Sequence, residues 1–88
     1  MVYAACLSEE STRRKIEVFT TEPGIQLYTG YWIAEMVVDG IKKFGKYSGV
    51  ALETQHYPDS IHHENFPTVI LRPREIYSHK TIYKFSVG

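Results

Sequence analysis

Residues 15–29 read Lys-Ile-Glu-Val-Phe-Thr-Thr-Glu-Pro-Gly-Ile-Gln-Leu-Tyr-Thr, and this stretch decides the fold class. Apolar and polar residues alternate on both sides of the turn at residues 22–24, and β-branched residues are frequent before it. An alternation of period two is typical of strands with one buried face. The pattern therefore predicts two strands, at residues 15–21 and 25–29, joined by a turn.

Three further segments carry the same signature. Residues 50–54 follow Ser48-Gly49, residues 68–72 lie between two prolines, and residues 81–87 alternate near the C-terminus. Residues 32–38 are predicted to be strand or irregular. Five strands separated by glycine and proline predict an all-β chain with an antiparallel sheet.

The composition of the 88 residues excludes several classes of protein. Ten basic and ten acidic residues give a net charge of zero, so neither nucleic acid nor a membrane surface is predicted as a partner. No apolar run approaches the ~20 residues that span a bilayer. The single cysteine, Cys6, and the lack of a signal-peptide pattern indicate a cytoplasmic location. A chain this short buries only ~64% of its unfolded surface, which predicts a thin core.

One motif has the spacing of a phosphate-binding loop. Residues 40–46 run from a glycine to a Gly-Lys pair, but Tyr47 stands where such a loop needs Ser or Thr to reach magnesium. A strand pattern follows, where that loop requires a helix. A lysine-bearing turn is therefore favoured.

The loop at residues 55–67 is long for so small a chain and rich in histidine. Adjacent histidines on an extended chain point to opposite sides, and no second ligand cluster has the spacing of a zinc site. We interpret these residues, and a further histidine before the last strand, as ordinary solvated groups and predict no metal. They are His56, Asp59, His62, His63, Glu64 and His79.

Gln26 and Glu53 are the best candidates for site residues. Each lies between apolar neighbours in a predicted strand, so period two sends its side chain to the opposite face. A glutamate in such a place either faces water, which is the ordinary case, or lines a cleft as a general base. The pattern alone leaves both interpretations open.

Three ordered blocks resemble the C-terminal portion of the aldose 1-epimerases, or galactose mutarotases. The resemblance covers nearly the whole chain from Ser11 onward. It implies that residues 1–88 are the C-terminal part of an aldose 1-epimerase-like domain, an antiparallel β-sandwich segment of a larger supersandwich. The blocks are Thr20–Gly30 (TTEPGIQLYTG), Ser48–Ser60 (SGVALETQHYPDS) and Asn65–Pro73 (NFPTVILRP), with Tyr83–Val87 (YKFSV) similar to the family's ending.

The resemblance implies an isomerase that interconverts the α and β anomers of aldohexoses such as galactose or glucose, with no cofactor. In this family a carboxylate takes the proton of the anomeric hydroxyl while a histidine protonates the ring oxygen. The ring opens, the C1–C2 bond rotates, and reclosure gives the other anomer. The matching blocks assign the base to Glu53 and a contact with sugar hydroxyls to Gln26.

The chain also departs from the family pattern. Tyr31 stands where Asn is usual, and Arg74 replaces the glycine of a turn, which adds strain if φ is positive there. The family's acid histidine, second histidine, aspartate and arginine lie upstream of the matched region. The 88 residues alone are therefore expected to be inactive. The alternatives are a non-catalytic carbohydrate-binding or interaction module and a relic fragment, and uncovered sheet edges would favour self-association.

Overall fold

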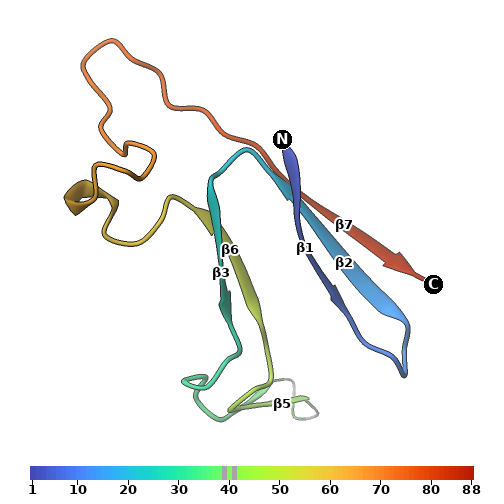
Figure 1. Cartoon of the computed structure of the whole chain (residues 1–88). Coiled ribbons are helices and arrows are strands. Elements are labelled where there is room, and N and C mark those ends of the chain that lie inside the picture. Colours follow the sequence, from blue (N-terminus) through green and yellow to red (C-terminus); the bar gives the residue numbers. More distant parts are fainter. Residues whose placement is uncertain (39, 41) are drawn as a thin grey trace.

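The computed structural model describes residues 1–38, 40 and 42–88. The described chain is all-β apart from one 3-10 turn, η1 (Ser60–His62), so the predicted fold class is confirmed. Its strands form three antiparallel sheets, ordered β1-β2-β7, β3-β6 and β4-β5 (Figure 1). The strands are β1 (Val2–Ser8), β2 (Arg14–Thr20), β3 (Gly24–Tyr28), β4 (Met36–Val38), β5 (Lys42–Phe44), β6 (Ala51–Gln55) and β7 (Thr81–Val87).

Four predicted strands match observed ones within one or two residues, namely β2, β3, β6 and β7. The sequence pattern missed β1, because residues 2–7 are apolar or aromatic throughout and show no alternation of period two. In the structure a bulge between Tyr3 and Ala5 also shifts the register of this strand. Of residues 32–38, the last three form β4. The phosphate-loop interpretation includes Ile41, which lies outside the described residues.

The strand predicted at residues 68–72 is wrong, because these residues form irregular, exposed chain. Pro67 and Pro73 flank the segment and lack backbone donors. No described strand lies in register beside it. An apolar run without a hydrogen-bonding neighbour does not become a strand, whatever its propensity.

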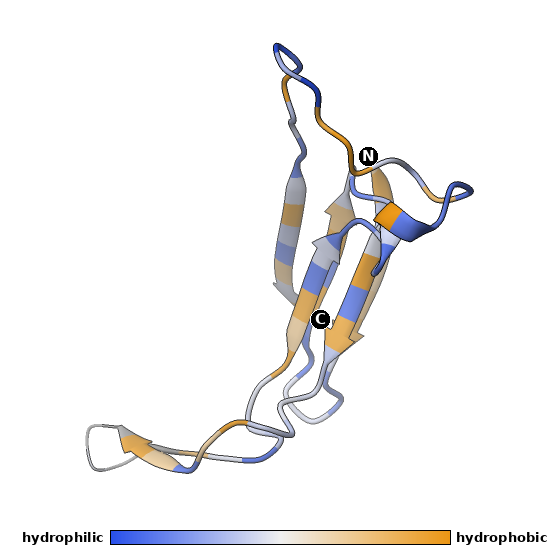
Figure 2. Ribbon diagram, turned by 90° about the vertical axis from the view of Figure 1, so that its left-hand side faces the viewer, coloured by the Kyte–Doolittle hydropathy of each residue, from blue (hydrophilic) through white to orange (hydrophobic). Residues whose placement is uncertain are grey.

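β2 is the central strand of the larger sheet. Its residues Ile16, Val18 and Thr20 share one face and lie opposite Phe85, Tyr83 and Thr81 of β7. Val18 on this face is fully buried. The alternation of apolar and polar residues along the strands is visible in Figure 2. We call this side of the β1-β2-β7 sheet the inner face.

The β3-β6 ribbon meets the inner face at its Thr20–Thr81 end. The Thr81 hydroxyl lies 2.8 Å from the Thr54 hydroxyl of β6 and 3.1 Å from that of Thr20. The Tyr83 hydroxyl donates to the Leu52 carbonyl at 3.0 Å. Because Thr54 contacts the inner face, the alternate residues of the ribbon, including Gln26, face away from the sheet.

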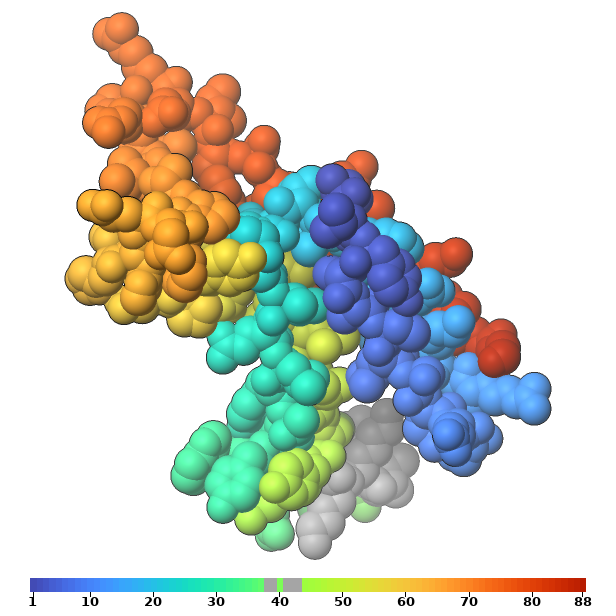
Figure 3. All heavy atoms as spheres, in the orientation of Figure 1, coloured from blue at the N-terminus to red at the C-terminus, as the bar shows by residue number. Residues whose placement is uncertain are grey.

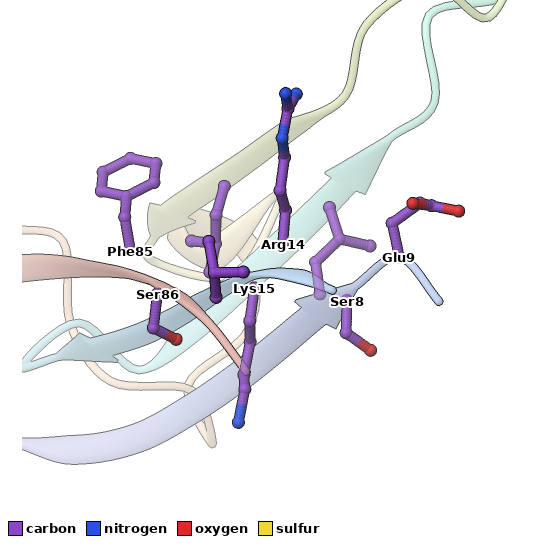
Figure 4. A pocket seen from close by; sticks show the side chains of 9 residues that line it. Ser8, Glu9, Arg14, Lys15, Phe85 and Ser86 are labelled. Carbon is purple, nitrogen blue, oxygen red and sulfur yellow. The ribbon is translucent and has the colours of Figure 1, made fainter. Parts of the chain in front are cut away.

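The other end of the inner face is uncovered. Leu7, Ile16, Phe85 and Val87 line an open cavity of about 670 Å³ there. Figure 4 shows Phe85 and Arg14 pointing to the side opposite that of Lys15 and Ser86.

The molecule is correspondingly extended. Its accessible surface is 7444 Å², against about 5,300 Å² for a folded monomer of this mass. Its radius of gyration is 17.0 Å, against about 12 Å for a compact domain of this length. Figure 3 shows the elongated outline, with residues 60–75 projecting from the strands. The thin core predicted from chain length is confirmed.

Arg74 adopts the left-handed conformation, with φ of 70°. It lies in a tight turn in which the Glu75 amide donates to the Arg72 carbonyl at 3.1 Å. The Glu75 carboxylate in turn accepts from the Arg72 amide at 2.7 Å. Arg74 therefore adds local strain, because a residue with a Cβ is disfavoured at this positive φ.

Substitution of Arg74 tests this strain. We expect Arg74→Gly to raise the free energy of unfolding by about 1 kcal/mol, because glycine adopts positive φ without steric cost. Arg74→Ala keeps the Cβ and is the matched control, with an expected change near zero. Urea unfolding measures both. An equal gain in the two variants would show that the arginine side chain, not the backbone, is responsible.

Candidate functional site

Gln26 and Glu53 lie directly opposite each other in the β3-β6 ribbon. Side chains so paired have Cβ atoms about 4.5–5.5 Å apart. Both are exposed, on the side of the ribbon that faces away from the inner face. The Gln55 side-chain amide donates to Gln26 Oε1 at 3.1 Å. One carboxylate and two amides thus form a polar patch, which we call the ribbon patch.

A cavity of about 250 Å³ adjoins the Gln26 end of the ribbon patch, lined by residues 24–26 and 55–58. The Tyr57 ring forms one wall and lies against Gly24, where an added Cβ would be 3.0 Å from Tyr57 Cδ1. Amides both donate and accept hydrogen bonds, whereas a carboxylate accepts a proton. The site therefore offers hydrogen-bond donors and acceptors beside a group that can act as a base.

Tyr31, which departs from the family pattern, lies three residues after Tyr28, the last residue of β3. Its ring packs edge-on against the rings of Trp32 and Tyr47, with ring centres 4.8 Å and 6.0 Å apart, respectively. Lys46 Nζ lies 4.1 Å from the centre of the Tyr31 ring. Tyr31 is therefore held within an aromatic group at the tip of the ribbon, and it does not line the cavity beside Gln26.

Glu22 gathers three side chains from distant segments. Its side chain is 3% exposed. His56 Nδ1 lies 3.1 Å from Oε2, His79 Nδ1 lies 3.3 Å from Oε1, and the Tyr77 hydroxyl donates to Oε1. We call Glu22, His56, Tyr77 and His79 the Glu22 cluster. It joins the β2–β3 turn to the end of β6 and to the segment before β7.

The two carboxylate oxygens of Glu22 differ in their hydrogen bonding. Oε1 accepts a hydrogen bond, whereas Oε2 has no hydrogen-bond partner among the described residues. The His56 contact is at ion-pair distance but lacks hydrogen-bond geometry, so it attracts Glu22 only when the imidazole is protonated. The hydrogen bond to the carboxylate raises the pKa of Tyr77, because that bond is lost when the phenol ionises.

The Glu22 cluster is the feature that sequence reasoning missed. The sequence pattern places Glu22 only in a turn and predicts that His56 and His79 are solvated, whereas the structure brings both histidines to the buried carboxylate. A signal was available, because Glu22 continues the period-two phase of Val18 and Thr20, the buried residues of β2. The histidines carry no comparable signal, since only the tertiary structure brings them to the carboxylate.

The other loop histidines contact Asp59. His62 Nδ1 lies 2.5 Å and His63 Nε2 lies 3.3 Å from its carboxylate oxygens, and all three side chains are exposed to solvent. Over residues 1–38, 40 and 42–88, no group of three His, Cys, Asp or Glu side chains has the arrangement of a metal site. None of the described helices is long and apolar enough to cross a membrane.

Comparisons with known proteins agree with the order of the sequence blocks. A family model described as aldose 1-epimerase matches residues 1–84. Galactose mutarotases from Mus musculus and Homo sapiens are each 42% identical over 92 residues, covering 98% of this chain and 25% of theirs. An aldose 1-epimerase from Escherichia coli K12 is 33% identical, covering 93% of this chain and 24% of its own length. No solved structure matches the chain.

The chain therefore belongs to the aldose 1-epimerase family. It matches the C-terminal quarter of its relatives and spans about a quarter of their length. The resemblance on which the expected fold and site residues rest is thus confirmed at the level of the family.

The Tyr77–Glu22 contact predicts an alkaline loss of stability. The raised pKa of Tyr77 means that folding favours the neutral phenol. Its contribution to stability is complete below the ordinary tyrosine range and is lost as pH rises through the raised value, when a phenolate would face the Glu22 carboxylate. We expect the melting temperature to fall at alkaline pH, and to fall less in Tyr77→Phe. Tyr47→Phe, at the tip of the ribbon, is the control and should keep the full decline. An equal decline in all three proteins would contradict this assignment.

Proposed function

We propose that this chain carries part of the active site of an aldose 1-epimerase, with Glu53 as the general base and Gln26 as a sugar contact. The observation that supports this most is the ribbon patch, in which the two residues oppose each other on an accessible face. The relatives named galactose mutarotase and aldose 1-epimerase support an aldohexose such as galactose or glucose as substrate.

In the proposed reaction the Glu53 carboxylate accepts the proton of the anomeric hydroxyl. The electron pair released forms the C1 carbonyl as the bond from C1 to the ring oxygen breaks, and an acid must protonate that oxygen. Rotation about the C1–C2 bond and reclosure return the proton from Glu53 to the new anomeric hydroxyl. Gln26 holds neighbouring sugar hydroxyls through its amide, whose orientation Gln55 fixes.

The reaction needs an acid as well as a base, and the family's acid histidine motif lies outside the region that this chain matches. We therefore propose that the 88 residues alone have little activity. A second candidate function, carbohydrate binding without catalysis, is supported by the cavity beside Gln26. The uncovered end of the inner face supports self-association of the isolated chain.

Polarimetry of freshly dissolved α-galactose tests the role of Glu53. The 88-residue chain and its Glu53→Gln variant should both leave mutarotation at the buffer rate. When the chain replaces the matching quarter of the mouse galactose mutarotase, Glu53→Gln should lower the rate by ~10²–10⁴, the usual contribution of general-base catalysis.

Glu64→Gln in the same chimera is the matched control, because Glu64 is an exposed glutamate in the loop after β6. It should leave the rate unchanged. An active chimera that tolerates Glu53→Gln would show that another group is the base. A clear difference between the isolated chain and its Glu53→Gln variant would show that the 88 residues are active alone.

A galactose titration of the ¹⁵N-labelled chain, followed by NMR, tests carbohydrate binding. We expect shifts of the Gln26 and Glu53 amides with a dissociation constant in the millimolar range, since half a cleft satisfies few hydroxyls. Gln26→Ala should abolish them. Asn65→Ala, which removes an exposed amide elsewhere, should not. NMR spectra that stay unchanged at high galactose concentration would exclude carbohydrate binding by this chain. Sedimentation of the same samples measures self-association.

A further inference from the structure

Among the described residues, the ion-pair contacts of Glu22 are to histidines, which carry a positive charge only when protonated. Its side chain is buried, and the two histidines are His56 and His79. Imidazole changes its charge between pH ~5 and ~8. A buried carboxylate without an opposite charge is costly. The strength of the contacts between Glu22 and the two histidines therefore depends on whether the imidazoles are protonated.

The Glu22 cluster sits at the root of the ribbon that carries the candidate site. Glu22 precedes Gly24, the first residue of β3, by two positions, and His56 directly follows Gln55, the last residue of β6. Gly24 and Gln55 are partners in the ladder. The packing there is tight, because a Cβ on Gly24 would lie 3.3 Å from the Gln55 carbonyl oxygen. Attraction between Glu22 and His56 thus acts on the first pair of the ribbon.

A short series of contacts leads from this root to the ribbon patch. The Gln55 side chain, adjacent to His56 in the chain, donates its hydrogen bond to Gln26 Oε1 at 3.1 Å. Gln26 faces Glu53 across the ladder. The hydrogen bond from Gln55 therefore orients the Gln26 amide, and Gln55 is the residue next to His56 in the chain.

We propose that Glu22 and His56 are positioning residues, and that protonation of the histidines in the Glu22 cluster orders the ribbon patch and couples its recognition of sugar to pH. The sugar part rests on the proposed function. The attraction is present while the imidazoles are protonated and is lost as pH rises through their titration. Tyr77 remains a neutral donor throughout this range, because the ordinary tyrosine pKa of ~10 already lies above it, and the hydrogen bond to Glu22 raises the pKa of Tyr77 further.

An NMR titration of the ¹⁵N-labelled chain from pH ~5 to ~8 tests the coupling. We expect the NMR signals of the Gln26 side-chain amide to shift with pH. The midpoint of this shift should equal the midpoint observed for the ring signals of His56 or His79. The titration is repeated in Glu53→Gln, which removes the titratable group opposite Gln26, and the shift should persist. Gln26 resonances that stay fixed while these rings titrate would overturn the proposal.

Two substitutions and a matched control assign the effect. Glu22→Gln removes the charge and His56→Gln removes a titrating group, so each should abolish most of the pH-dependent shift of Gln26. Asp59 also contacts two histidines, but it is 58% exposed and lies in the loop. Asp59→Asn should keep the full shift. A full shift in either folded Glu22→Gln or folded His56→Gln, or an equal loss in Asp59→Asn, would contradict the proposal. If one variant fails to fold, the other variant and the unsubstituted chain still test the proposal.

Galactose added at pH 6 and at pH 8 separates this inference from the proposed function. We expect larger galactose-induced shifts of Gln26 at pH 6. If Gln26 titrates with the cluster but galactose shifts nothing at either pH, the proposed function fails and the positioning role stands. If galactose binds equally at both pH values, sugar recognition is not coupled to pH and that part of the inference is wrong.

Discussion

The contact between the β3-β6 ribbon and the inner face is the constraint on which the rest of the structure depends. Hydroxyl contacts among Thr20, Thr54 and Thr81 bring the two sheets together. The Glu22 cluster joins the same three segments, and each of Glu22, His56 and His79 lies two residues from one of these threonines. Because so few groups connect the sheets, the placement of the candidate site relative to the main sheet depends on polar contacts more than on a hydrophobic core.

This arrangement explains why one side of the ribbon is available for a ligand. Thr54 is engaged with the inner face, so its neighbours Glu53 and Gln55 face the opposite way. The ladder then places Gln26 opposite Glu53, and Gln55 holds the Gln26 amide. A carboxylate and an amide are thereby presented together on one accessible face of the ribbon.

The open end of the inner face reflects the same shortage of contacts. Phe85 and Val87 are each 73% exposed, although they lie on the face that buries Val18. An apolar sheet face of this kind is normally covered by a second layer. The relatives that the chain matches are about four times its length, which is consistent with a fold whose layers are shared over a longer sequence.

The turn at Arg74 is indicated only by the resemblance to the family, which leaves the sign of φ open, and the structure gives it a positive φ. Local pattern was sufficient for four strands, for the turn between β2 and β3, and for the faces of Gln26 and Glu53. Alternation of period two and the needs of tight turns act between near neighbours, so sequence by itself determined these features. It failed at residues 68–72, because a strand needs a partner as well as propensity. It also failed at the Glu22 cluster, where Tyr77 lies 55 residues from Glu22. Only the tertiary structure decided that contact, because burial of a carboxylate and its approach to two histidines arise when separate segments meet in space.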